Sequence, residues 1–238
     1  MNTSRPKPQA PHPDVLYEDN HIIIVNKRAS DIVQGDKTGD VPLSETVKKY
    51  IKEKYNKPGE VFLGVVHRLD RPVSGAVIFA RTSKALTRLN EMIRDRKIQK
   101  IYWAVSAAMP PDIKGRLTHY LRRNQKKNMS FAYPDPGPNR LMAELDYRYL
   151  ASSDNYHLLE IDLLTGRHHQ IRVQLADIGC VIKGDLKYGA KRSNKDASIH
   201  LHARKIKMIH PVRKETLEVI APVPDDPVWK FFEEQFGS

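Results

Sequence analysis

Short apolar runs, separated by polar segments that contain glycine or proline, make up most of the chain. The run at 21–25 is rich in β-branched residues and is expected to form the first buried strand. The apolar runs at 61–66 and 75–80 predict two more buried strands. Further strands, with turn signals between them, are predicted at 100–108, 115–121, 128–133, 141–151, 156–164, 199–209 and 215–221.

Three other segments have apolar residues at helical spacing. The first helix is expected from Ser44, as its capping residue, to about Tyr55, and the second begins at Thr82 or Ser83. A third is expected at about 168–178. The inward faces are predicted to hold Val47, Tyr50 and Ile51, then Leu86, Leu89 and Ile93, then Ile171, Leu175 and Ile178. Because strands outnumber helices, the pattern predicts an α+β fold with a mixed, largely antiparallel central sheet and flanking helices.

The domain organisation is expected to be simple. Residues 1–13 hold four prolines among polar residues and predict a flexible N-terminal tail, followed by a single domain at 14–238. No apolar run approaches the ~20 residues of a membrane helix, and the first residues lack the apolar centre of a signal peptide. The one cysteine, Cys180, excludes an intramolecular disulfide and a cysteine-based zinc site. These features favour a soluble protein of a reducing compartment, the cytoplasm.

The charge balance indicates a polyanionic partner. Forty Lys and Arg against 28 Asp and Glu give 40 − 28 = +12, and a strong basic excess is typical of nucleic-acid binding. A basic but merely solvated surface is the simpler alternative. An anionic membrane ranks last, because no basic amphipathic helix with an aromatic apolar face stands out. Two basic clusters are candidate phosphate contacts: Arg122, Arg123, Lys126 and Lys127, and then Lys183, Lys187, Lys191, Arg192 and Lys195.

A polar loop, His67–Pro72, separates two of the predicted buried strands. It offers one carboxylate, Asp70, beside the cations Arg68 and Arg71. Loops at the edge of a rigid scaffold commonly carry catalysis, and nearby cations keep a carboxylate ionised. On this spacing alone, however, an ordinary surface loop with an ion pair is the better interpretation.

A longer string changes that interpretation. Residues Gly64–Gly75, with the sequence GVVHRLDRPVSG, resemble the active-site motif of the RluA-type pseudouridine synthases. Three further segments resemble that family in the same order, namely Lys100–Val105, Thr165–Arg172 and Leu201–Ala203. Gly184-Asp185 with Tyr188-Gly189 also fits the stretch that follows the third motif. The resemblance covers about residues 14–222, and several motifs in register make a chance match very improbable.

The resemblance implies a cofactor-free isomerisation of uridine in RNA. It assigns Asp70 as the catalytic aspartate, Tyr102 as the tyrosine that stacks on the target base, and Arg172 as the arginine that pairs with the aspartate. Arg167 is the main alternative partner for Asp70. Ile171 matches an aliphatic residue beneath the site, and Arg68 matches a residue that fills the gap left by a flipped nucleotide. The remaining polar motif residues are assigned to substrate binding: His67, Arg71, Arg167, His168 and Gln170.

Two departures from the family pattern stand out. Val73 occupies a position where the family usually has Thr, so one hydroxyl beside the motif is lost. Many relatives carry an N-terminal RNA-binding module, whereas only about 13 residues precede the expected core here. Recognition is therefore expected to come from the core itself, with a stem-loop of ribosomal or transfer RNA as the substrate and no obligate protein partner.

Other functions remain as alternatives at this point. A non-catalytic RNA-binding or ribosome-assembly protein with the same fold is the main one, and a DNA-acting enzyme is weaker. The histidines His168, His169, His200 and His202 could in principle gather, but no acidic or cysteine partner has metal-ligand spacing, so no metal is expected. His168 precedes Arg172 by four residues, and on a helix it would lie beside the arginine and support it.

Overall fold

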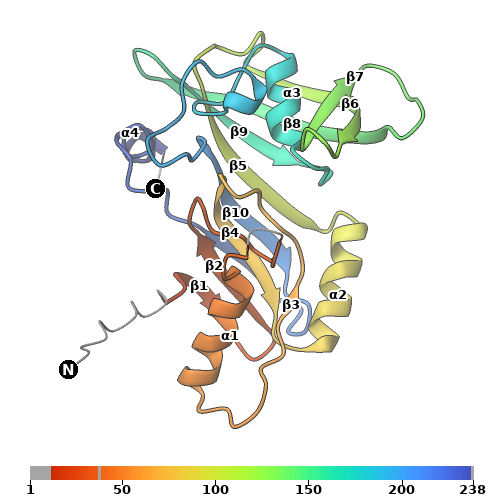
Figure 1. Cartoon of the computed structure of the whole chain (residues 1–238), viewed down its shortest axis with the longest axis vertical. Coiled ribbons are helices and arrows are strands. Elements are labelled where there is room, and N and C mark those ends of the chain that lie inside the picture. Colours follow the sequence, from red (N-terminus) through yellow and green to blue (C-terminus); the bar gives the residue numbers. More distant parts are fainter. Residues whose placement is uncertain (1–11, 37–38, 237–238) are drawn as a thin grey trace, which may run out of the picture.

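Within residues 12–36 and 39–236, which the structure describes, a computed structural model forms one sheet of eleven strands (Figure 1). The first strands are β1 (Val15–Glu18), β2 (Ile22–Lys27), β3 (Gly64–Val65), β4 (Ser74–Ala80), β5 (Ile98–Ser106) and β6 (Lys114–Asn124). The others are β7 (Met129–Tyr133), β8 (Leu141–Ser152), β9 (His157–Leu163), β10 (Leu201–Ile209) and β11 (Thr216–Ile220). The α-helices of the described residues are α1 (Leu43–Lys54), α2 (Ser83–Arg94), α3 (Gln170–Asp177) and α4 (Pro227–Phe236).

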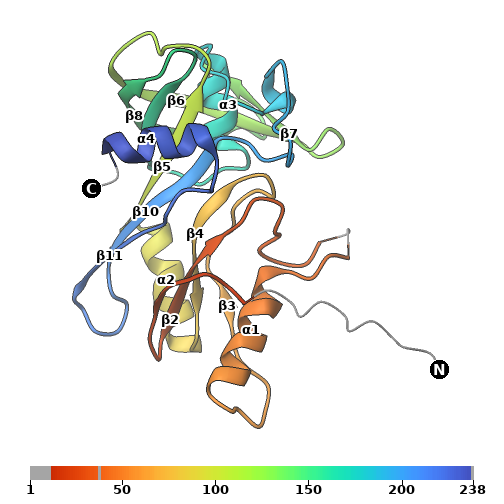
Figure 2. The same cartoon turned by 90° about the vertical axis from the view of Figure 1, so that its left-hand side faces the viewer.

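The strands follow the order β1-β2-β4-β10-β5-β9-β8-β6-β7, with β3 beside β4 and β11 beside β10. All the named pairings are antiparallel except that of β10 with β4. The central strands β10 and β5 join a lower half, which carries α1 and α2, to an upper half with α3 and α4 (Figure 2). The predicted α+β class with a mixed, largely antiparallel sheet is thereby confirmed.

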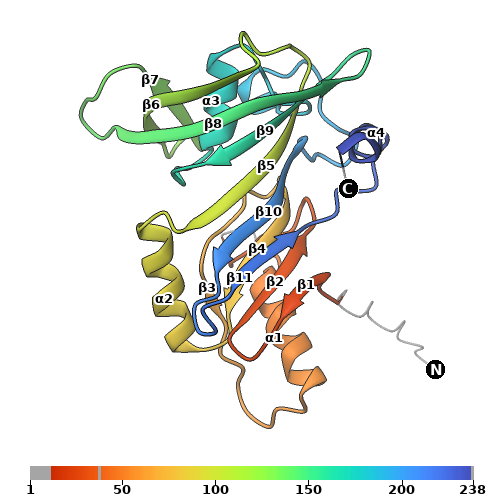
Figure 3. The same ribbon diagram turned by 180° about the vertical axis from the view of Figure 1, so that it is seen from behind.

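The helices cover both faces of the sheet, because the strands alternate their buried side chains between two cores. One core holds Ile23 and Val25 of β2 together with residues of α1 and α3. The alternate residues Ile22 and Ile24 pack with α2 on the other face. On this second face, in the upper half, α4 covers Trp103 and lies toward the viewer in Figure 3.

Several predicted boundaries were wrong. Only Gly64–Val65 of the run at 61–66 is a strand, since Phe62 is 49% exposed and does not join the core. Ser44 does not cap α1; it lies buried in the first turn, and Pro42 occupies the N-cap position without a side-chain bond. Thr82, by contrast, accepts a hydrogen bond from the amide of Ala85 at 3.2 Å and caps α2.

The third helix starts later than the pattern indicated. It begins at Gln170, because His169 adopts a left-handed conformation with φ 55° and ends the preceding loop. His168 therefore lies outside the helix and does not stack along it beside Arg172. Gly179, with φ 81°, ends the segment as expected of a C-terminal glycine.

Two elements were not predicted. Strand β1 adds a half-buried edge to β2, and α4 packs Trp229 and Phe232 against the upper half of the sheet. Most of the predicted flexible tail, residues 1–11, lies outside the described residues, and the single domain at 14–238 stays a prediction. In the ranges that the structure describes, no helix has the length and apolar character to cross a membrane.

Candidate active site

A cleft of about 390 Å³ opens between the two halves, and the three main sequence motifs meet in it. Its lining comes from the segment 66–70, from Lys100 and Tyr102 of β5, and from the segment 166–172 at the start of α3. These segments lie far apart in sequence but become neighbours because β5 and β10 bridge the halves (Figure 1). The cleft contains all three predicted catalytic residues, Asp70, Tyr102 and Arg172.

The Asp70 carboxylate is half-buried, with 29% of its side chain exposed, and is held on one oxygen. Arg172 donates from Nη1 to Asp70 Oδ2 at 3.0 Å. His169 Nε2 lies 3.5 Å from that same oxygen. Both contacts fall on Oδ2, so the carboxylate is oriented while Oδ1 faces neither of these groups. Of the two arginines that the sequence left open, it is Arg172 that pairs with Asp70.

Arg172 is itself fixed by a second carboxylate. Asp185, fully buried, accepts from Arg172 Nε at 2.7 Å and from Nη2 at 2.8 Å, while the Tyr188 ring lies 5.2 Å from the guanidinium carbon. Burial opposes the charge of Arg172, but the hydrogen bonds and charges of Asp185 and Asp70 outweigh it and raise its pKa. The stretch 184–189, noted in the sequence without a role, thus braces the arginine.

Two adjacent histidines line the cleft beside this group. Burial, together with the charge of Arg172, lowers the pKa of His169 to about 2, so its ring is neutral. His169 Nδ1 shares a hydrogen bond with the Tyr188 hydroxyl at 2.9 Å. His168 stacks on His169 at 3.8 Å between ring centroids and bonds to Ser130 Oγ at 2.9 Å. Its predicted support of Arg172 was therefore wrong, and His169, which sequence reasoning gave no role, is the histidine next to Asp70.

Tyr102 is buried in the central core together with Ile171, the residue predicted to lie beneath the site. Burial, and then the negative charge of Asp70, raise the pKa of the Tyr102 hydroxyl. The phenol is therefore neutral, and its ring is rigidly presented to the cleft. Val73, the departure from the family pattern, is also buried in this core and lines the cleft.

His67 and Lys100 both line the cleft. His67 Nε2 accepts the amide proton of Ile78 at 3.1 Å, which ties the motif to β4. Burial, and then the charge of Lys100, lower the pKa of His67 to about 3. Burial also lowers the pKa of Lys100. Sequence reasoning gave Lys100 no role, although it opens the motif that contains Tyr102.

The other predicted substrate-binding residues divide into two groups. Arg68 and Arg167 are exposed and line the cleft, where they could reach a polyanion. Gln170 is buried, and its amide braces the turn before α3 by accepting from Thr165 Oγ1 and the amide of Arg167. Arg71 is not among the residues that line the cleft, and it forms ion pairs with Asp40 at 2.7 Å and Asp36 at 3.5 Å.

A buried lysine beneath the motif was missed from the sequence. Lys27, only 1% exposed, donates from Nζ to the carbonyls of Arg28, Arg71 and Val73 at 2.9, 3.1 and 2.7 Å. Two of these bonds, to Arg71 and Val73, fix the backbone that directly follows Asp70. A charged residue at the end of a strand that opens with four apolar residues was the available signal.

The described part of the chain holds no group of three or more His, Cys, Asp or Glu side chains placed to bind a metal ion. The histidines considered for such a site separate into different environments. His202 bonds to Ser74 Oγ at 2.8 Å inside the core, and His200 pairs with Asp226 at 3.0 Å, while His168 and His169 stay in the cleft.

Comparison with known proteins agrees with this arrangement. A model of the family described as RNA pseudouridylate synthase matches residues 21–177. An uncharacterised RNA pseudouridine synthase of Bacillus subtilis is 31% identical over 90% of this chain and 69% of its own length. The ribosomal large subunit pseudouridine synthase C of Buchnera aphidicola subsp. Baizongia pistaciae is 32% identical over 88% of this chain and 66% of its own length.

The chain therefore belongs to the RNA pseudouridylate synthase family, which confirms the family and the class of enzyme predicted from the motifs. It spans 52% to 69% of the length of such curated relatives. The fold agrees as well: the human RNA pseudouridylate synthase domain containing 4 superposes with a TM-score of 0.77 at 23% identity, covering 93% of this chain and 92% of that one.

Proposed function

We propose that this chain converts uridine to pseudouridine in structured RNA, with Asp70 as the nucleophile. The observation that carries the proposal is the orientation of the Asp70 carboxylate. Arg172 and His169 both approach Oδ2, at 3.0 and 3.5 Å, and the carboxylate borders an open cleft. An ionised nucleophile needs such a cation beside it when it is partly buried.

The reaction follows from what each side chain can do. A uridine inside a stem must leave its stack at a cost of a few kcal/mol, and exposed Arg68 at the cleft is suited to occupy the vacated space. Asp70 attacks the nucleotide, the bond between the base and the sugar breaks, and the base turns. A carbon of the base then bonds to the sugar as the carboxylate leaves; that carbon gives up its hydrogen as a proton, and the ring nitrogen freed from the sugar takes up a proton. Tyr102 supplies a stacking face while the base is detached. An isomerisation conserves atoms and electrons, so its stoichiometry requires no cofactor.

The substrate class follows from charge and from the names of the relatives. Exposed Arg68, Arg123 and Arg167 surround the cleft, which suits phosphates on both sides of a target nucleotide. Relatives are named for the large ribosomal subunit. We therefore propose a stem-loop of ribosomal RNA, or of transfer RNA, as the substrate and the cytoplasm as the place of action.

The test has two arms. Pseudouridine is mapped across total RNA from cells with and without the protein, and the purified wild type and Asp70→Asn are assayed on the RNA so found. We expect a site that disappears without the protein, and an Asp70→Asn variant that binds the RNA but forms no product. If the wild type forms no pseudouridine in any cellular RNA, the proposal is wrong and a non-catalytic RNA-binding protein becomes the better description.

A further inference from the structure

We propose that the outer face of β6, β7 and β8 is a second RNA contact, which stacks bases of the strand that leaves the cleft. We call it the arginine–aromatic face, and it consists of Tyr120, Arg122, Phe131, Tyr133, Arg140 and Met142. It deepens the proposed function and rests on it, because its ligand is the flanking, unpaired part of the substrate RNA.

Strand alternation puts these side chains on one side of the sheet. Leu121, Ala132 and Ala143 point inward and pack near Val173 of α3. Their neighbours in sequence must point outward. The register then places Tyr120 between Tyr133 and Met142, and Arg122 opposite Phe131. The rings of Tyr120, Tyr133 and Phe131 therefore lie in neighbouring positions, with Arg122 beside them. Met142, which completes the row, is 39% exposed.

Arg140 is held in place on this face. Its guanidinium carbon lies 3.7 Å from the centroid of the Tyr133 ring, and its Nη1 donates to the carbonyl of Asp135 at 3.1 Å. A Cβ on Gly137 would come within 3.0 to 3.1 Å of the Arg140 side chain, so the glycine leaves the space that Arg140 fills. Arg122 also lies over Tyr133, at 5.7 Å. A pre-positioned planar cation loses little freedom when a base stacks on it.

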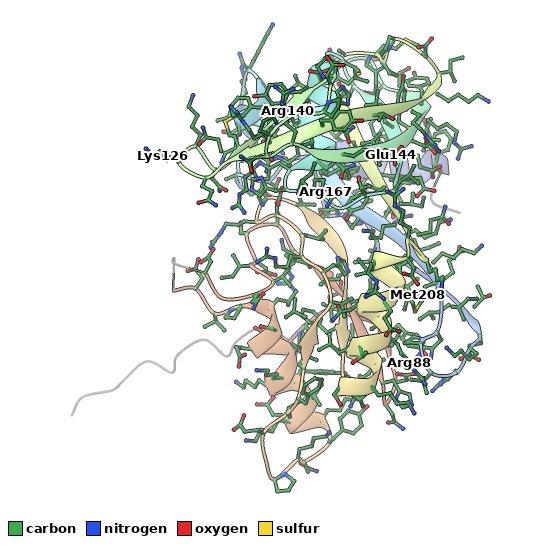
Figure 4. All side chains as sticks on the ribbon, turned by 90° about the vertical axis from the view of Figure 1, so that its right-hand side faces the viewer. Arg88, Lys126, Arg140, Glu144, Arg167 and Met208 are labelled. Carbon is green, nitrogen blue, oxygen red and sulfur yellow. The ribbon has the colours of Figure 1, made fainter. Side chains whose placement is uncertain are left out.

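The face is continuous with the cleft. Arg167, which lines the cleft, donates from Nε to the carbonyl of Met142 at 3.0 Å. Figure 4 shows Arg140 above Arg167 on the same side of the molecule, with Lys126 at the tip of the β6–β7 hairpin. A strand that passes Arg167 would therefore meet Met142 and Tyr120 next, and then Tyr133 with its arginines.

The chemistry of the face fits RNA better than it fits a protein surface. Guanidinium groups bind phosphates and stack on bases, and aromatic rings stack on any base. Glu144, which follows on β8, is already paired with Arg96 at 3.2 Å, so it does not cancel the charge of Arg122 and Arg140. By contrast, the outward arginines farther along β6 and β8, Arg116 and Arg148, are paired with Asp146 and Glu160.

The experiment measures how much an unpaired extension adds to binding. Labelled stem-loop RNAs are made with no extension, or with about ten unpaired nucleotides on the 5′ or the 3′ side, and their Kd is measured by fluorescence anisotropy. We expect one of the two extensions to tighten binding to the wild type by about tenfold. Arg140→Ala should abolish this gain. Gly137→Ala should reduce it without removing any charge, because it displaces Arg140 from Tyr133.

Matched variants separate stacking from charge. Arg140→Lys keeps the charge but loses the planar group, so it should retain the salt dependence and still lose most of the gain. Arg148→Ala, an exposed arginine paired with Glu160 at 2.8 Å, should keep the full gain. The inference is overturned if neither extension tightens binding, as expected for a face that contacts a protein, or if Arg140→Ala retains the gain. If Arg140→Ala loses the gain in binding but the wild type forms no pseudouridine, this inference stands and the proposed function is wrong.

Discussion

Asp185 accepts two hydrogen bonds from the guanidinium of Arg172, at 2.7 and 2.8 Å, and the same guanidinium donates to Asp70 from Nη1 at 3.0 Å. One cation is thus shared by two carboxylates, and the three groups together carry a net negative charge. Arg172 uses one edge of its guanidinium, Nε and Nη2, for Asp185, and it contacts Asp70 from Nη1. This arrangement keeps Asp70 oriented without giving it the full charge of the arginine.

Asp185→Asn should therefore slow the reaction without preventing RNA binding. In the wild type each oxygen of Asp185 accepts one hydrogen bond from the guanidinium. Asn replaces one of these oxygens by an NH2 donor, so Arg172 and with it Asp70 lose their fixed position. Misplacement of a reacting group by about 1 Å can cost on the order of 10²-fold in rate. We expect kcat to fall by roughly that factor with KM little changed. Asp177→Asn, an exposed change on the helix that carries Arg172, should have no such effect. An unchanged kcat for Asp185→Asn would show that Asp185 does not hold Arg172 in place.

Tyr102 should remain protonated throughout the working pH range. Burial and the charge of Asp70 raise its pKa above the ordinary value of 10.0, and a raised pKa preserves the neutral phenol to higher pH. The hydroxyl can therefore donate a proton but is not available as a phenolate base. Ultraviolet titration of wild type against Tyr102→Phe should show a difference only above pH 10.0. A phenolate that appears below that pH, and is absent from the variant, would contradict the assignment.

Lys27→Met should destabilise the protein and loosen the loop that carries Asp70. The carbonyls of Arg28 and Val73 would lose their bonds to Nζ, whereas that of Arg71 also accepts the amide proton of Ser30 at 2.9 Å. Of these two bonds, the one to Val73 is buried. A buried acceptor left without a partner costs about 1–3 kcal/mol, and we expect a loss of that size by urea unfolding. Lys52→Met, an exposed change on α1, serves as the control. An equal loss of unfolding free energy in Lys52→Met would show that the buried bonds of Lys27 are not the cause.

His202 should make the fold sensitive to mild acid. The ring is fully buried between Ser74 Oγ and the carbonyl of Ala221, and burial lowers its pKa from 6.5 to about 4. The unfolded chain therefore binds this proton first as the pH falls, and stability is lost between pH 6.5 and about 4, at about 1.4 kcal/mol per pH unit. In urea unfolding across this range, His202→Gln should show a pH slope smaller by one proton. An identical slope would show that His202 does not titrate in this way.

Much of the fold could be predicted from local patterns, because strand and helix periodicity reflects which face is buried. The apolar runs of β2 and β4 and the periodic face of α2 were recognisable for this reason. The edge strand β1 and the helix α4 were missed. Each is stabilised by contacts with distant elements, β1 along β2 and α4 over Trp103, rather than by a strong pattern of its own.

The sequence by itself determined the family and which residues are the candidates for the chemistry, because Asp70, Tyr102 and Arg172 each lie within a short motif. Only the tertiary structure decided how they meet: that Arg172 rather than Arg167 reaches Asp70, that Asp185 holds Arg172, and that His169 rather than His168 lies beside them. The contacts among Asp70, Arg172 and Asp185 join positions that are distant along the chain. The choice between His168 and His169 depends on a difference of one residue within a loop. Their geometry depends on the packing of the two halves and on the left-handed turn at His169, which no local pattern of side chains encodes.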